Sequence, residues 1–78
     1  MTDERLIRKF LNDKTHITID DCDRILASCG YYLKKSSGSH RGYHHKGFQP
    51  ITIVQSKKTK YVKIPYVNRI IKNLRLEE

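Results

Sequence analysis

One histidine stands in a setting that could support chemistry on a phosphate. His40 follows the turn-forming residues 36–39 and has Lys34, Lys35 and Arg41 close to it in the sequence. Cleavage of RNA without a metal needs a base for the 2′-hydroxyl proton and cations that stabilise the charge developing on phosphorus. An imidazole can exchange a proton near neutral pH, so this segment supplies both residue types. His40 is therefore a candidate catalytic residue. The alternative is a turn histidine that only contacts phosphate or solvent.

Metal chemistry is not expected from the remaining candidates. In a strand, His40 and His44 would share a face about 13 Å apart, too far to chelate one ion, and His45 would point to the other face. The only carboxylate cluster is Asp20, Asp21 and Asp23, where a helix is expected to begin. Acids in a first turn answer the positive end of the helix dipole. The sequence thus predicts no metal and no cofactor.

The charge is divided unevenly along the chain. The 16 Lys and Arg against eight Asp and Glu give a net charge of +8. Residues 1–33 carry a net charge of −1, whereas residues 34–78 carry +9 and hold acids only at positions 77 and 78. A basic half of this kind suits a polyanion: a nucleic acid, an acidic protein or an anionic membrane surface. The segregation favours a nucleic acid, with Lys57, Lys58 and Lys60 in one loop as candidate backbone contacts.

The length of 78 residues limits the chain to one small domain, predicted over residues 1–78. No apolar run approaches the roughly 20 residues of a membrane span, and the first residues lack a secretory signal, so we expect a soluble, cytoplasmic protein with no membrane partner. Cys22 and Cys29 are seven residues apart in a helical pattern. Seven helical steps separate two residues by about 10.5 Å, so buried free thiols are expected instead of a disulfide.

The hydrophobic periodicity changes twice along the chain. Helices are predicted over residues 3–12, 19–29 and 65–74, and strands over residues 31–35, 39–45 and 51–54. Thr18 and Asp21 are expected to form an N-terminal capping box for the second helix, and Gly30 to end it. The order α-α-β-β-β-α predicts a two-layer α+β domain, in which a three-stranded antiparallel sheet carries helices on one face.

At this point the chain resembles the HicA, or YcfA-like, family of bacterial toxin–antitoxin toxins. The resemblance runs from Thr18 to Leu74: an amphipathic helix ends in Gly30-Tyr31, a basic strand follows, and Gly38-Ser39-His40 opens the next strand. Residues 1–16 are similar to an N-terminal helical extension of longer members. Two departures concern a second histidine, because a Pro-x-His after the third strand and a repeated histidine after the motif are both absent. His44 and His45 are the candidates for that role.

The resemblance implies a fold like the double-stranded-RNA-binding domain and a ribosome-independent ribonuclease that cleaves mRNA. It implies His40 as the catalytic residue and a HicB-type antitoxin as the partner protein. The residues expected to bind RNA are the following: Lys34, Lys35, Ser39, Arg41, Lys57, Lys58 and Lys60. The competing hypothesis is a non-catalytic RNA-binding module, since double-stranded RNA is recognised through shape and phosphate contacts that need no catalytic histidine.

Overall fold

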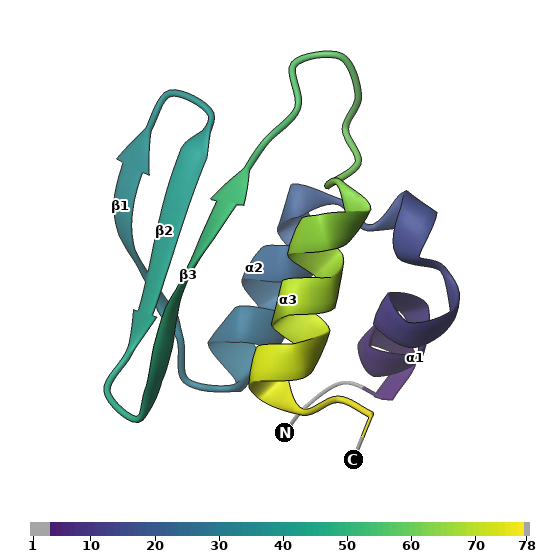
Figure 1. Ribbon diagram of the computed structural model, residues 1–78, viewed down its shortest axis with the longest axis horizontal. Helices are drawn as coiled ribbons and strands as arrows, with labels where there is room; N and C mark the ends of the chain where they lie inside the picture. Colours follow the sequence, from purple (N-terminus) through teal and green to yellow (C-terminus); the bar gives the residue numbers. More distant parts are fainter. Residues whose placement is uncertain (1–3, 78) are drawn as a thin grey trace.

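The computed structural model describes residues 4–77, and within them three α-helices accompany a three-stranded sheet (Figure 1). The elements are α1 (Glu4–Asn12), a short 3₁₀ helix η1 (Lys14–His16), α2 (Ile19–Ser28), β1 (Tyr32–Ser37), β2 (His40–His45), β3 (Phe48–Val54) and α3 (Ile64–Leu74). The predicted α+β class and the order α-α-β-β-β-α are confirmed. Asp3, which the first helix was predicted to include, lies outside the described residues. None of the described helices is long and apolar enough to cross a bilayer.

The sheet is an antiparallel meander with the spatial order β1-β2-β3. Its hairpins close on the pairs Ser37–His40 and His45–Phe48, which leaves two residues in each turn. The strands predicted over residues 31–35 and 51–54 were therefore too short at the turns, since β1 ends at Ser37 and β3 begins at Phe48. Gly38 adopts a φ of +58°, a conformation that glycine takes without steric cost. This tight reversal allows β1 to continue to Ser37.

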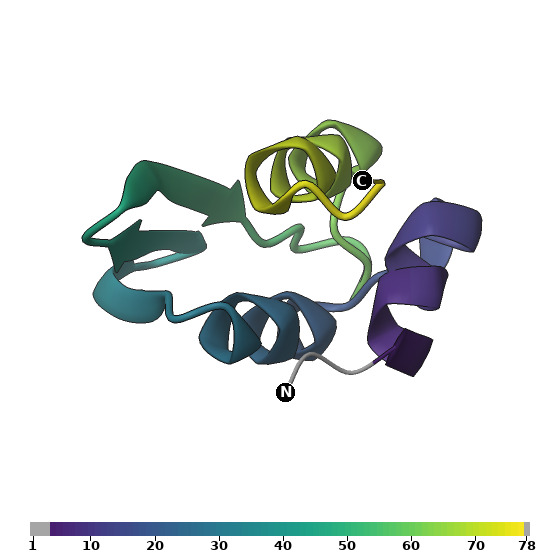
Figure 2. The same cartoon turned by 90° about the horizontal axis from the view of Figure 1, so that it is seen from below.

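The helices cover one face of the sheet. Figure 2 shows α2 and α3 on the same side of the strands, and no described element lies over the opposite face. Tyr43, Ile51 and Ile53 are buried beneath the helices. Their neighbours along the strands, such as Thr52, remain exposed or half-buried. A domain of this size has one core, so the side chains on the opposite side of the sheet do not pack into it. We name that side the open face.

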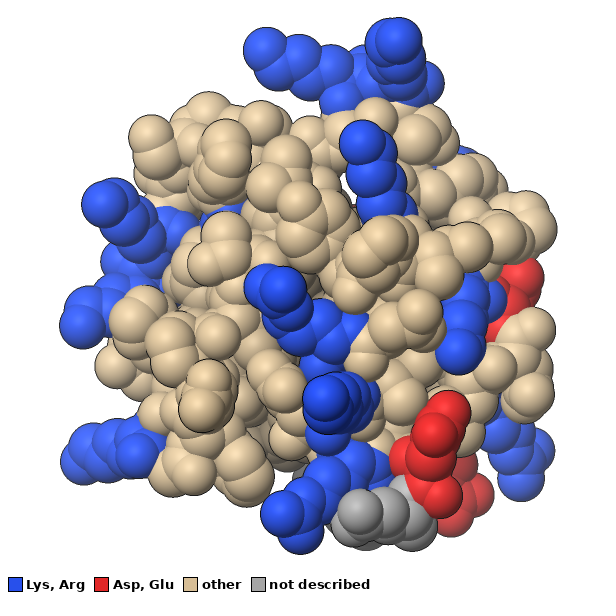
Figure 3. Space-filling model, viewed as in Figure 1, with Lys and Arg blue, Asp and Glu red and all other residues tan. Residues whose placement is uncertain are grey.

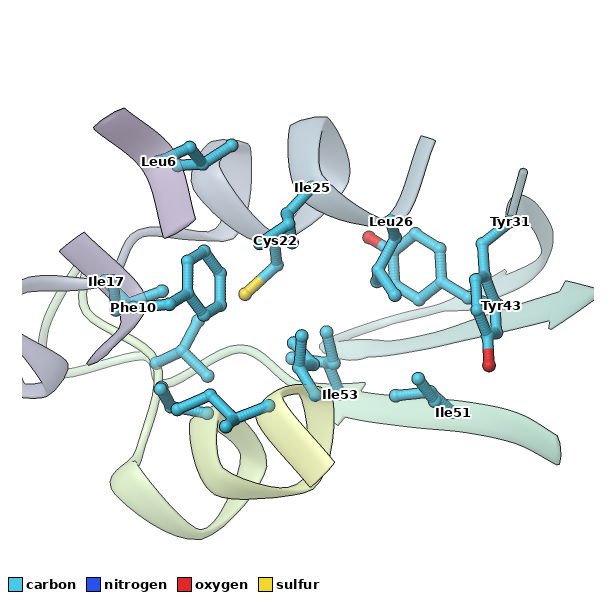
Figure 4. Close-up of a cluster of buried hydrophobic side chains, with 14 residues drawn as sticks. Leu6, Phe10, Ile17, Cys22, Ile25, Leu26, Tyr31, Tyr43, Ile51 and Ile53 are labelled. Atoms are coloured by element: carbon cyan, nitrogen blue, oxygen red, sulfur yellow. The ribbon is translucent and has the colours of Figure 1, made fainter. Parts of the chain in front are cut away.

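The core is built from apolar positions of all three helices and from the inner face of the sheet (Figure 4). The helical contributions are Leu6 and Phe10 of α1, Cys22, Ile25 and Leu26 of α2, and Val67, Ile70 and Ile71 of α3. Both cysteines are free: Cys22 is buried and Cys29 half-buried. Burial raises the pKa of the Cys22 thiol to about 12, so this side chain acts as a small hydrophobe.

The second helix begins and ends as its sequence predicts. The Thr18 hydroxyl accepts a hydrogen bond from the Asp21 amide (3.2 Å), and the Asp21 carboxylate accepts one from the Thr18 amide (3.0 Å). The same carboxylate accepts a hydrogen bond from the Lys9 ammonium at 2.6 Å, which ties α1 to α2. After the helix, Gly30 adopts a φ of +90°, and a Cβ there would lie 2.8 Å from Nε2 of His45. Only glycine fits this position.

The segment between β3 and α3 is held at both ends by backbone hydrogen bonds. The Gln55 amide donates to the Ser39 carbonyl at 2.7 Å, and the Val62 amide donates to the Ile17 carbonyl at 2.7 Å. Tyr61 forms an isolated bridge with Thr18, and Ile64 begins α3. The first bond places the lysine-rich loop beside the β1–β2 turn.

The capping box generates a prediction about stability and pH. Burial opposes ionisation of Asp21, but its hydrogen bonds with Lys9 and Thr18 outweigh that effect and hold its pKa below 3.8. A lowered folded-state pKa stabilises the protein above the unfolded value, and this contribution is lost as the pH falls below about 3.8. Asp21→Asn should therefore lower the free energy of unfolding by about 1 kcal/mol near neutral pH.

Urea unfolding at about pH 7 and about pH 3 measures this difference, which should shrink at the lower pH. Asp20→Asn is the matched control, since Asp20 lies in the same first turn but is exposed. Its effect should stay within about 0.5 kcal/mol. Equal losses in the two variants would contradict the assignment to Asp21.

Candidate functional site

The register of β2 sorts its side chains between the two faces of the sheet. Gly42 pairs with Lys35 on β1 and with Thr52 on β3, and all three lie on the open face together with His40. Successive residues of a strand point to opposite faces. Arg41 therefore points toward the helices, as buried Tyr43 does. His40, by contrast, is exposed to solvent.

His40 lies where two shallow hollows meet. One hollow, of about 310 Å³, is on the open face and is lined by Lys35, Ser37, His40, Gly42 and Thr52. The other surrounds the β1–β2 turn and is lined by residues 37–40 together with Gln55, Ser56 and Lys57. Ser37 and His40 border both. The side chain is thus accessible from the sheet surface and from the loop side.

A third hollow continues this surface beyond the loop. Lys57 and Ser56 line it as well, together with Lys58, Lys63 and Tyr66. Each hollow shares lining residues with the next one, so the three form one continuous strip. We name it the open-face strip; it runs from Lys35 through His40 to Lys58. An extended ligand could lie along a strip of this kind.

The strip is cationic. Within residues 4–77, no carboxylate lies within ion-pair distance of Lys35, Lys57 or Lys58. In the described chain, the Asp21 carboxylate is ion-paired with Lys9 and the Asp23 carboxylate with Arg41, and the Asp13 carboxylate lies 2.6 Å from Nδ1 of His16. Figure 3 shows Lys and Arg side chains over α3, over the loop after β3 and at the outer edge of the sheet, while the acids visible on this face lie on the side of α1. The strip therefore suits an anionic ligand.

Arg41 is not brought to this strip. Its guanidinium donates to the Asp23 carboxylate at 3.1 Å and to the Tyr43 hydroxyl at 3.0 Å. The Tyr43 hydroxyl in turn donates to the same carboxylate. Burial, together with the hydrogen bond to Asp23, raises the pKa of Tyr43 to about 12, so the hydroxyl stays protonated. This network joins β2 to α2 on the face opposite His40.

The other predicted RNA-binding residues fall in different places. Ser39 lines the hollow at the β1–β2 turn. Lys34 is exposed at an irregularity in β1, between Leu33 and Lys35. Lys60 lies over the ring of Tyr61, with its ammonium 5.4 Å from the ring centroid, and does not line the three hollows of the strip. The structure thus gathers Lys35, Ser39 and Lys57 around His40, and Lys58 lies further along the strip.

The two remaining histidines of β2 have different environments. His44 pairs with Tyr32, and the two ring centroids are 6.4 Å apart. His45 lies near the helices, with its ring 5.2 Å from that of Tyr31, and its Nδ1 accepts a hydrogen bond from the Gly47 amide at 2.8 Å. His45 therefore supports the β2–β3 turn, while His44 shares the open face with His40.

Some residues at the site carried no specific signal in the sequence. Asp23 was interpreted only as part of an acidic first turn, yet it binds Arg41 and Tyr43. The alternating basic and aromatic residues of β2 are the signal that could have pointed to such a partner. Tyr32, Lys63 and Tyr66 were assigned to elements and not to a site. Among residues 4–77, no three His, Cys, Asp or Glu side chains lie together as a metal site would require.

Comparison with known proteins gives one finding. A family model described as the HicA toxin of bacterial toxin–antitoxin systems matches residues 19–76, well over half of the chain. No curated protein and no solved structure matches significantly. The match begins at the first residue of α2 and ends two residues after α3.

The network on the helix side generates a prediction that separates Arg41 from the lysines of the strip. Arg41→Met should lower the free energy of unfolding by about 1–3 kcal/mol, because the half-buried Asp23 carboxylate loses its charged donor. Lys35→Met, on the same sheet but on the open face, should change it by less than about 0.5 kcal/mol. Thermal and urea unfolding of both variants measures this. Equal stabilities would show that the network contributes nothing.

Proposed function

The chain belongs to the HicA toxin family of bacterial toxin–antitoxin systems, and we propose that it acts there as a metal-independent endoribonuclease that cleaves mRNA with His40 as general acid or base. The observation that carries the proposal is the position of His40. Its imidazole is exposed on the open face, at the junction of hollows that also contain Lys35 and Lys57. A proton-exchanging group and phosphate-binding cations therefore share one accessible surface.

The chemistry requires few groups. The 2′ oxygen of a ribose attacks the adjacent phosphorus, the bond to the 5′ oxygen breaks, and a cyclic phosphate and a 5′ hydroxyl result. His40 would take the proton from the 2′ hydroxyl as a base, or supply one to the departing 5′ oxygen as an acid. Lys35 and Lys57 would stabilise the negative charge on the phosphoryl oxygens. None of these steps needs a metal ligand.

A non-catalytic RNA-binding module is the second candidate. It is favoured by the same cationic strip, which could bind a phosphate backbone whether or not His40 transfers a proton. Incubation of the purified protein with labelled mRNA in EDTA separates the two candidates. Cleavage supports the ribonuclease, and binding without cleavage supports the module.

Membership of a toxin–antitoxin family implies an antitoxin partner. We propose a HicB-type protein that covers the open-face strip, in the cytoplasm where mRNA is available. Its surface should offer carboxylates or hydrogen-bond acceptors to Lys35, Lys57 and Lys58. Cross-linking from Lys57 or Lys58 to the antitoxin should succeed in the complex. Cross-links confined to α1 would contradict this placement.

The central prediction concerns His40. His40→Ala should slow RNA cleavage by a factor of about 10²–10⁴, which is the usual contribution of general acid–base catalysis. The side chain is exposed and has no packing role, so the free energy of unfolding should change by less than about 0.5 kcal/mol. A cleavage assay in EDTA and a melting curve on the same preparation measure both quantities.

His44→Ala is the matched control, because His44 lies on the same strand and the same face. At saturating RNA it should cleave within about tenfold of the wild-type rate, since it does not border the hollows around His40. Wild-type cleavage by His40→Ala would remove the catalytic assignment and favour the RNA-binding module.

The lysine loop generates a prediction about salt. Replacing Lys57, Lys58 and Lys60 together by glutamine should weaken RNA binding and flatten its salt dependence, because each phosphate contact releases about 0.7 counterions from a single strand. The slope of log K against log salt should fall by about 1.4, the share of the two lysines that line the strip. Lys60→Gln alone is the control and should leave the slope nearly unchanged. A triple variant with the wild-type slope would place the loop away from the RNA.

A further inference from the structure

Two aromatic rings extend the open face on the side of Gly42 away from His40. Tyr32 and His44 are partners in the β1–β2 register, and their ring planes are inclined by 34°. Tyr32 is 53% exposed, more than the other large hydrophobic side chains of the described chain. His44 is half-buried. A single exposed tyrosine is ordinary, but here the exposed ring lies beside a second ring at the end of a cationic strip.

Gly42 separates this pair from His40, and the backbone does not require glycine there. Its φ is not positive, and a Cβ would meet only Lys35, in ordinary contact at 3.7 Å. Glycine within a strand weakens the strand because it has no side chain to pack. The missing side chain leaves the hollow beside His40 open and lets a ligand approach the backbone of the central strand.

These features distinguish between two forms of RNA. Bases in a duplex are stacked on each other and offer no free ring face, and a duplex is recognised through its phosphates and 2′-hydroxyl groups. Unpaired bases stack on exposed aromatic side chains, while cations follow the backbone. An exposed tyrosine on the open face, next to Lys35 and a strand position without a side chain, therefore fits an unpaired strand better than a duplex.

We propose that the open face binds an unpaired segment of RNA, with one base stacked on Tyr32 and His44 and the backbone crossing Gly42 toward His40. Tyr32 is then a substrate-binding residue, and the target site in the message must be single-stranded. This inference rests on the proposed function in that it takes the ligand to be RNA. The distance from His40 to His44, about 13 Å along an extended strand, sets how far the stacked base lies from the reacting phosphate.

The experiment uses the His40→Ala protein, which should bind without cleaving. Fluorescence anisotropy measures the Kd for a short unstructured RNA oligonucleotide and for the same sequence in a full duplex. Tyr32→Ala should weaken binding of the unpaired oligonucleotide by about 5- to 100-fold, the usual effect of losing one base–aromatic stack, and should leave duplex binding within about twofold. Tyr32→Phe should retain most of the affinity, since its ring can still stack.

Leu33→Ala is the matched control. Leu33 is the next residue of the same strand and is 43% exposed, but it pairs with Tyr43, whose side chain faces the helices. This variant should bind the unpaired oligonucleotide within about twofold of the parent protein. Gly42→Val, which fills the hollow without requiring a positive φ, should weaken binding while the melting temperature is retained.

Further outcomes overturn the inference. Equal affinity of Tyr32→Ala and the parent protein for the unpaired oligonucleotide would do so, as would tighter binding of the duplex. Binding of neither RNA, with tight binding of the antitoxin at Tyr32, would assign the surface to that protein instead. Cleavage by the wild-type protein is scored separately. Cleavage without dependence on Tyr32 rejects this inference alone, and Tyr32-dependent binding without cleavage rejects only the ribonuclease.

Discussion

The alternation of side chains along β2 is the constraint on which the rest of the structure depends. This strand is the centre of a three-stranded sheet, and it is hydrogen-bonded on both sides. Because successive residues face opposite sides, Tyr43 enters the core while Gly42 and His40 remain on the open face. A shift of one residue would bury the imidazole and expose the tyrosine. Folding stability and presentation of the site are therefore set by the same register.

The helix side fixes that register with more than apolar packing. The hydrogen bonds among Arg41, Asp23 and Tyr43 join the middle of β2 to α2. They hold the guanidinium of Arg41, the residue after His40, on the helix side. At the other end of β2, His45 packs against Tyr31, and its Nδ1 accepts a hydrogen bond from the Gly47 amide. Both structural side chains face the helices. His40 has no comparable structural role, so its imidazole can contact a ligand without loss of packing in the core.

Local signals in the sequence were sufficient for the fold. Thr18, Asp21 and Gly30 each perform the role that their residue types predict, because capping and left-handed turns depend on neighbours within a few residues. The candidate site needed more. The alternation rule that separated His44 from His45 also separates His40 from Arg41, but proximity in sequence suggested that this pair acts together, and the partner Asp23 is 18 residues away.

The periodicity of the sequence could not predict that Tyr32 and Lys35 lie on the same face of the sheet. The register of β1 shifts between Leu33 and Lys35, so Lys34 has no partner on β2 and the alternation restarts after it. Tyr32 and Lys35 consequently share the open face although they are three positions apart, a spacing that an uninterrupted strand would place on opposite faces. One irregularity thus brings an aromatic ring and a cation to the same surface as His40.

The two-layer architecture also explains where the charge can accumulate. The carboxylates of Asp21 and Asp23 are used on the helix side, in the cap of α2 and in the network with Arg41. Lys35, Lys57 and Lys58 have no such partners within residues 4–77, and their mutual repulsion opposes the compact state. A polyanion on the open face would relieve that repulsion, and a ligand that binds only the folded chain also stabilises it. Repulsion on the open face therefore destabilises the free protein, and a polyanion bound to the same face would stabilise it.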